Sequence, residues 1–149
     1  MQIIQATCDH LDLLVPMFVR YRELYGARPM VELSRAFLEQ RIRSQEAVVY
    51  LAFTKDSNEL IGFSLLYTSY SSLSLRPVWI LNDIFVIESA RRKQVARSLV
   101  IRSRDDATAA NAVRLRVATN THNNAIRKMY ESLGFYENPQ LTNYILPLD

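Results

Sequence analysis

Cysteine and glycine are scarce in this sequence of 149 residues. The one cysteine, Cys8, excludes an internal disulfide, and we expect it to pack in the core of a protein from a reducing, cytoplasmic setting. Only three glycines occur, so each is expected at a turn or a close backbone contact. No apolar run approaches the ~20 residues of a membrane span, and the first residues lack the basic segment of a signal peptide. We therefore expect neither a membrane anchor nor a secretion signal.

The sequence also has little excess of charge of either sign. Lys and Arg number 18 against 15 Asp and Glu, which gives a net charge of +3. This excess is too small to indicate a nucleic-acid partner, and the cations lack interleaved aromatic residues. The two histidines, His10 and His122, are far apart and lack ligand-like spacing, so we expect no metal site. No Ser-His-Asp set and no Walker loop is visible.

The pattern of apolar residues predicts one α/β domain over residues 1–149, with a mixed central sheet and about four helices. The hydrophobic fraction of 49% is typical of a globular protein. Two strands joined by the turn "KDSNE" form a predicted hairpin. Strands are predicted at 1–7, 47–54, 60–70, 78–86, 112–119 and 141–148. Helices are predicted at 31–44, 94–110 and 123–134, and a first helix, capped by Thr7 or Asp9, carries apolar residues from Leu11 to Leu24.

Three cations, Arg91, Arg92 and Lys93, precede the helix that is predicted from Gln94. Positive charge at a helix N-terminus opposes the helix dipole, so these residues cost stability unless an anion binds there. The first turn of a helix also has unpaired backbone N–H groups that can hold phosphate oxygens. We interpret residues 91–96 as a turn that wraps a pyrophosphate, and the alternative is a solvated basic face.

Two segments together resemble the GNAT superfamily of N-acetyltransferases. The stretch "DIFVIESARRKQVARSLV" resembles the acetyl-CoA signature, in which a strand ending in Val leads through a short loop to Gln/Arg-x-x-Gly-x-Gly/Ala at a helix start. The stretch "NNAIRKMYESLGF" resembles the second signature, with Asn123, Tyr130, Gly134 and Phe135 at the set offsets. The order of predicted elements matches that fold over nearly the whole chain. Within the superfamily, "WILNDIFV" and "GFSLLYTSYSS" look most like the diamine, polyamine and Hpa-type acetyltransferases.

The resemblance implies acetyl-CoA as co-substrate. It implies that the backbone of Ile84, Phe85 and Val86 binds the pantetheine arm, and that Asn123 holds the pantetheine or positions the acetyl end. Tyr130 would donate its phenolic proton to the leaving thiolate. The alternatives are core packing for Tyr130 and a helix cap for Asn123. The diphosphate would be held by Arg91, Arg92, Lys93, Gln94, Val95 and Ala96. Arg97 and Ser98 are further cofactor-binding candidates.

Three positions affect how the chemistry would proceed. Asp83 lies in an apolar strand and is the candidate for binding or deprotonating the amine, with a structural salt bridge as the alternative. Asn82 stands where some relatives carry Glu, and it cannot act as a base. The family usually has glycine at the position of Gln94 and often at that of Arg92. An inward Gln94 side chain would weaken cofactor binding, whereas an outward one would leave the N–H groups accessible.

The implied function is transfer of an acetyl group from acetyl-CoA to a primary amine, such as a small diamine, a polyamine or an amino acid. The alternatives are a protein lysine or N-terminal amine as acceptor, or a degenerate acyl-CoA-binding domain without catalysis. Tyr21 and Tyr25 could line an acceptor pocket or simply pack. Relatives commonly form dimers, so a homodimer is expected, with no nucleic-acid or membrane partner.

Overall fold

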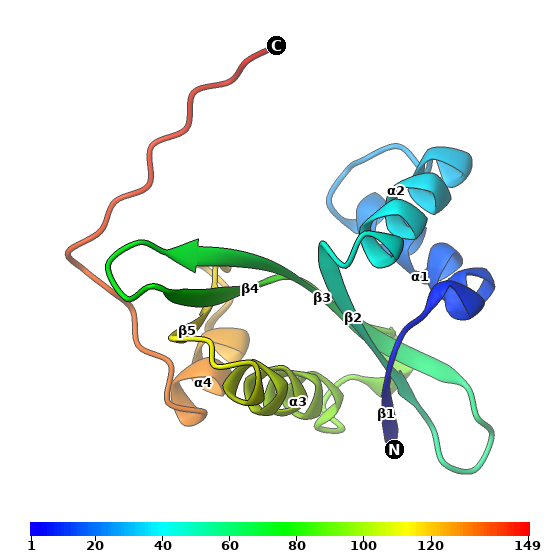
Figure 1. Ribbon diagram of the computed structural model, residues 1–149. Helices are drawn as coiled ribbons and strands as arrows, with labels where there is room; N and C mark the ends of the chain where they lie inside the picture. The colour runs from blue at the N-terminus through cyan, green and yellow to red at the C-terminus, as the bar shows by residue number, and fades with distance from the viewer. The chain divides into compact units, whose positions relative to one another are not determined.

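A sheet of five strands occupies the centre of residues 1–118 (Figure 1). The structure is a computed structural model that describes all residues from 1 to 149, which form two compact units, 1–118 and 119–149. The strands follow the order β1-β2-β3-β4-β5, in which only β4 and β5 are parallel. They are β1 (Gln2–Gln5), β2 (Ala47–Phe53), β3 (Leu60–Ser71), β4 (Arg76–Val86) and β5 (Arg114–Val117). The predicted mixed α/β fold class is confirmed.

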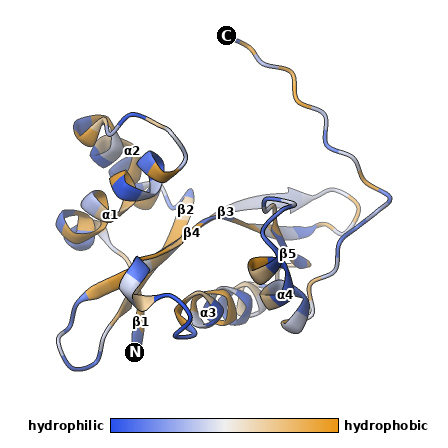
Figure 2. Ribbon diagram, turned by 180° about the vertical axis from the view of Figure 1, so that it is seen from behind, coloured by the Kyte–Doolittle hydropathy of each residue, from blue (hydrophilic) through white to orange (hydrophobic).

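Helices cover both faces of this sheet (Figure 1). In the first unit α1 (Leu11–Leu24) and α2 (Val31–Arg43) lie on one face, and α3 (Val95–Ala109) lies on the other. Strands buried on both faces are apolar along most of their length, and β2 and the central part of β3 are accordingly orange in Figure 2, whereas the helices carry blue outer sides. None of the helices combines the length and the apolar character needed to cross a membrane.

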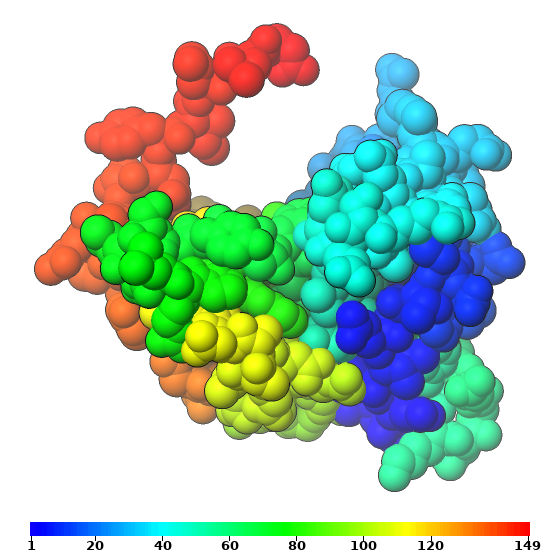
Figure 3. Space-filling view, viewed as in Figure 1, coloured from blue at the N-terminus to red at the C-terminus, as the bar shows by residue number.

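The β3–β4 hairpin is longer than the region that α1 and α2 cover. Its tip, with Leu73 99% exposed, lies far from both helices (Figures 1 and 3). The far halves of β3 and β4, together with β5, are therefore not covered by α1 and α2. Gly62 lies near the other end of this hairpin, where a Cβ atom would stand only 2.8 Å from the carbonyl oxygen of Phe85. The sequence needs glycine there because β3 and β4 approach closely.

Asn82 is an extra residue in β4. Leu65 of β3 lies opposite Asp83 and Leu66 lies opposite Leu81, so no β3 residue opposes Asn82. A β-bulge of this kind shifts the alternation of side chains by one position. Asp83 therefore faces the α1 side of the sheet, and not the α3 side that simple alternation would assign to it.

The two strands β4 and β5 separate just before this bulge. Their pairing runs from Val78 opposite Arg114 to Leu81 opposite Val117, and it ends there. Beyond Leu81, the edge of β4 that faced β5 has no strand beside it. The last residues of β4 therefore keep backbone groups that a ligand can reach.

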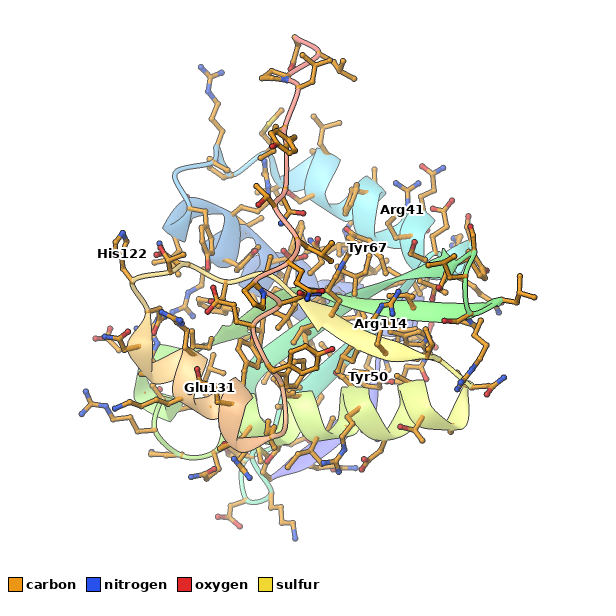
Figure 4. All side chains as sticks on the ribbon, turned by 90° about the vertical axis from the view of Figure 1, so that its left-hand side faces the viewer. Arg41, Tyr50, Tyr67, Arg114, His122 and Glu131 are labelled. Carbon is orange, nitrogen blue, oxygen red and sulfur yellow. The ribbon has the colours of Figure 1, made fainter.

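A polar network joins α3 to β1 and β2. The buried Tyr50 donates its hydroxyl to Asp106 Oδ2 at 2.7 Å, and Arg102 Nε donates to the same oxygen at 2.8 Å. Arg102 also donates to the carbonyl of Ile3 at 3.3 Å, and Figure 4 shows Tyr50 between the sheet and α3. Burial opposes ionisation of Asp106, but the hydrogen bonds from Tyr50 and Arg102 outweigh it and lower the pKa of this carboxyl.

The second unit contains α4 (Asn124–Ser132). Asn123 caps its N-terminus by accepting the N–H of Ile126 at 3.2 Å, so the predicted helix cap is confirmed. At its C-terminus Gly134 has a φ of 93°, and the N–H of Phe135 donates to the carbonyl of Tyr130 at 3.1 Å. This Schellman motif brings the rings of Phe135 and Tyr130 to 5.2 Å. Glycine is required at position 134 because of its positive φ.

The predicted last strand, residues 141–148, is wrong. This segment has no regular secondary structure. A strand exists only where a neighbouring strand pairs with its backbone, and apolar residues alone do not supply that partner. Its large apolar side chains are all strongly exposed, namely Leu141, Tyr144, Ile145, Leu146 and Leu148.

The Asp106 network yields a test of stability. We expect Asp106→Asn to lower the free energy of unfolding at pH 7 by about 1 kcal/mol, because the amide loses the charge-assisted bond from Arg102. The folded pKa of Asp106 is lowered, so its stabilisation is present above the unfolded value of ~3.9 and is lost as the pH falls through the folded value. Urea denaturation at pH 7 and under acid conditions measures both effects.

Asp105→Asn is the matched control, because Asp105 lies beside Asp106 on α3 but forms an exposed ion pair with Arg104. Its effect should stay below about 0.5 kcal/mol. A deficit of Asp106→Asn that is the same at every pH would contradict the assigned role of the carboxylate.

Candidate active site

Asp83 is a buried carboxylate without a cationic partner. Its side chain accepts the hydroxyl of Tyr21 at Oδ1, 2.5 Å away, and the amide of Asn82 at Oδ2, 3.0 Å away. The residue is only 9% exposed, and none of the ion pairs in the structure includes it. The alternative of a structural salt bridge is therefore wrong. Neutral donors satisfy this carboxylate, and its charge is not balanced within residues 1–118.

Tyr21 is held by α1 in a cluster of aromatic rings. Its ring lies 5.8 Å from that of Phe63 and 6.3 Å from that of Phe85, in both cases edge to face. Burial raises the pKa of Tyr21, and the hydrogen bond to the Asp83 carboxylate raises it further. The phenol therefore stays protonated in the neutral range and keeps donating to Asp83.

The hydrogen bond between Tyr21 and Asp83 was not predicted from the sequence. The two residues are 62 positions apart, and the bulge at Asn82 that brings them together has no local signal. The one available signal was chemical, because a carboxylate in an apolar strand needs a partner. That signal indicates that a donor exists but does not identify it.

The basic turn has the backbone conformation of a glycine-rich turn although it contains no glycine. Arg92 has a φ of 61° and Gln94 a φ of 66°, both in the left-handed region that glycine favours. Gln94 is exposed, and its side chain makes no capping hydrogen bond to α3.

The N–H groups of this turn are available to a ligand. No acceptor within the structure pairs with the backbone N–H of residues 92–96, whereas that of Ser98 already donates to the carbonyl of Gln94 at 2.9 Å. Arg92 and Lys93 are exposed, and Arg91 is fixed because its Nε donates to the carbonyl of Val86 at 3.2 Å. Consecutive free N–H groups at the start of α3, flanked by cations, fit a diphosphate.

A hollow of about 300 Å³ adjoins the turn on the α1 side. Phe85 lies in its wall, with the guanidinium of Arg20 5.9 Å from the centre of the ring. Two cations and two anions line it, so its charges balance and it is not itself a polyanion site. The lining residues are Arg20, Glu23, Leu24, Phe85, Glu88 and Arg91.

The predicted site residues fall into two groups. Within residues 1–118, the end of β4 joins Asp83 to the turn, and Ile84, Phe85 and Val86 lie on the β4 edge that β5 leaves open. The predicted residues at the start of α3, from Val95 to Ser98, form its first turn. Asn123 and Tyr130 belong to the second unit, where Tyr130 is buried and packs against Phe135.

Comparison with known proteins points to acetyltransferases. The family model described as Acetyltransferase (GNAT) family matches residues 13–135. The chain is 34% identical over 146 residues to the Bacillus subtilis (strain 168) protein named "Uncharacterized N-acetyltransferase YhfO", which covers 98% of this chain and 97% of that protein. It is 51% identical to a crystal structure of a probable acetyltransferase, with a TM-score of 0.95 over 100% of this chain and 99% of the other.

A more distant solved structure shares the fold. It is an aminoglycoside N-acetyltransferase, AAC(6')-Iy, in complex with CoA, with a TM-score of 0.75 at 21% identity. The match covers 98% of this chain and 99% of the other. At this identity the likeness supports the fold alone.

The strained turn gives a second test of stability. We expect Gln94→Gly to raise the free energy of unfolding by up to about 1 kcal/mol, because relief of the left-handed strain exceeds the added entropy of the unfolded chain. Arg104→Gly, at an exposed interior position of α3, should instead lower it by about 1 kcal/mol. Urea denaturation compares the two. Equal losses would show that the Gln94 side chain stabilises the fold.

Proposed function

This chain belongs to the GNAT family of acetyltransferases, and we propose that its acceptor is a small primary amine that Asp83 binds. The family makes it an acetyl-CoA-dependent N-acetyltransferase. The observation that carries the proposal is the buried carboxylate of Asp83, which has hydrogen-bond donors but no counter-ion. An ammonium group would supply the missing charge.

The two donors orient Asp83 for this role. Tyr21 occupies one lone pair of Oδ1 and Asn82 one lone pair of Oδ2, which leaves further lone pairs for an incoming N–H. An alkylamine has an unperturbed pKa of ~10.4, so it arrives protonated at neutral pH and must lose a proton before it can attack. Asp83, directly or through a water, is the proposed acceptor of that proton.

The turn at the start of α3 is proposed to hold the diphosphate of acetyl-CoA. When bound, this co-substrate supplies an acetyl group activated as a thioester. Its charge would be met by the N–H groups of residues 92–96 and by the side chains of Arg91, Arg92 and Lys93, with Arg97 and Ser98 one turn further along α3. The open edge of Ile84, Phe85 and Val86 would bind the pantetheine arm through backbone groups.

Tyr130 is proposed to protonate the leaving thiolate, and Asn123 to position the pantetheine. The capping motif of α4 fixes the Tyr130 ring against Phe135, so the phenol has a defined orientation within its unit. Asn123 already caps α4 through Oδ1, and its amide nitrogen is still available to donate. Both roles are inferred from the family.

Several finer features stay predictions. A single catalytic domain over residues 1–149, a homodimer and a cytoplasmic location are each inferred from the sequence. Among acceptors, we consider diamines, polyamines and amino acids as the first group, and lysine or N-terminal amines of proteins as the second.

An acetyl-transfer screen tests the proposal. Free thiol release from acetyl-CoA is followed with amino acids, diamines, polyamines and lysine peptides, and acetyl-CoA binding is measured by calorimetry. We expect Asp83→Asn to lower kcat/KM for the amine by roughly 10²- to 10⁴-fold and to leave acetyl-CoA affinity unchanged. Asp105→Asn, an exposed acid on α3, should have no effect. Binding of acetyl-CoA without transfer to any amine would refute the proposed function.

Tyr130→Phe separates proton donation from packing. Because the ring is kept and only the hydroxyl is lost, we expect kcat to fall by roughly 10²-fold with little change in acetyl-CoA affinity. Single-turnover kinetics and calorimetry measure the two quantities. Parallel losses in both would instead assign Tyr130 a structural role.

A further inference from the structure

Two arginines on β5 lack any partner. The strand reads "RLRV", and its alternation places Arg114 and Arg116 on one side and Leu115 and Val117 on the other. Both arginine side chains are exposed, and neither takes part in an ion pair or a side-chain hydrogen bond in the structure. The two cations therefore face solvent with their charges unbalanced.

The strand register places these arginines on the same face as Asp83. Arg116 lies opposite Ile80, which in turn lies opposite Tyr67 of β3. Asp83 lies opposite Leu65, two residues from Tyr67, and residues two apart on a strand share a face. The bulge at Asn82 is what brings Asp83 to this side.

The separation along the sheet suits a small molecule. Asp83 is on β4 and Arg116 is on the neighbouring β5, and their partners on β3 are two residues apart. One strand spacing combined with two residues along the strand puts their Cα atoms roughly 8 Å apart. In Figure 4 the labelled Arg114, Tyr67 and Arg41 follow one another from β5 towards α2. Arg41 forms an ion pair with Glu46 at 2.5 Å, so its charge is already balanced. Arg114 and Arg116 of β5, by contrast, have no anion beside them on this face.

We propose that the acceptor is an amine that also carries an anionic group, with its ammonium at Asp83 and its anion at Arg116 and Arg114. One face of the sheet carries a buried anion that has no cation and two cations that have no anion. This arrangement of charges is complementary to a zwitterion. Arginine binds carboxylate and phosphate groups through paired N–H donors. A diamine or polyamine would instead place its second ammonium against these arginines, which the like charges oppose. This inference rests on the proposed function and selects the amino-acid class among its acceptors.

The experiment compares acceptors that differ only in the anion. Each α-amino acid is paired with its primary amide, and each ω-amino acid with the diamine of the same chain length, in the thiol-release assay with saturating acetyl-CoA. We expect the anionic member of the best pair to have at least about 10-fold higher kcat/KM. Equal or lower values for every anionic member would overturn the inference, while transfer to the amides would still support the proposed function.

Substitutions at β5 test the assigned residues. We expect Arg116→Gln to lower kcat/KM for the anionic acceptor by roughly 10- to 100-fold, mainly through KM, and to leave the matched amide or diamine within about 3-fold. Arg116→Lys should restore part of the loss, and Arg116→Glu should favour the diamine. Arg104→Gln, which removes an exposed arginine from α3, is the matched control and should change neither acceptor.

The remaining outcomes are also decisive. If Arg116→Gln does not fold, as judged from its circular dichroism and melting temperature, Arg114→Gln is measured in its place and is expected to act in the same direction. An unchanged ratio of anionic to amide acceptor in both folded variants would overturn the inference. Absence of transfer to every amine despite acetyl-CoA binding would overturn the proposed function and this inference together.

Discussion

Asn82 has no partner on β3, and this extra residue turns the Asp83 carboxylate towards α1, where the Tyr21 hydroxyl meets it at 2.5 Å. The same place in β4 is where pairing with β5 ends, so the bulge, the polar contact and the open edge coincide. Bulges commonly redirect a side chain beside a functional site. Here the redirected group is the one carboxylate in an otherwise apolar strand, and the aromatic cluster around Tyr21 keeps α1 in place over it.

The turn before α3 shows how conformation and residue type can be separated. Arg92 and Gln94 take up the left-handed conformation that glycine adopts without strain, and they do so at the two positions where the family pattern favours glycine. Such residues are strained by about 1 kcal/mol or more each, which the surrounding packing must offset. The buried Val95 directly after Gln94 starts α3 and fixes the end of the turn. A sequence pattern based on glycine therefore misses a turn whose backbone conformation is the one that the pattern describes.

Much of the fold could be predicted because its signals are local. The apolar runs of β2, β3 and β4, the turn between the first two and the helical spacing of α2 and α3 each reside in a short stretch of sequence. The segment after Leu141 has the same local signal and forms no strand, since pairing depends on a partner. Likewise Asp83 could be identified as chemically unusual, but its donor Tyr21 and the bulge depend on contacts between distant residues. Local patterns therefore predicted the helices and strands, whereas the site could not be predicted because it depends on how these elements pack together.

The choice of neutral donors at Asp83 has an electrostatic consequence. Had an arginine of the chain paired with it, an incoming ammonium would have had to displace a bidentate partner, which is costly for a buried ion pair. Tyr21 and Asn82 orient the carboxylate without neutralising it. Burial raises the pKa of Tyr21, so its hydroxyl keeps the proton that it donates to Asp83. Arg114 and Arg116 are on β5, about one strand spacing and two residues away, and not beside Asp83. Opposite charges that are held apart on one face favour a ligand that spans them, because any ligand with a single kind of charge satisfies one end and is repelled by the other.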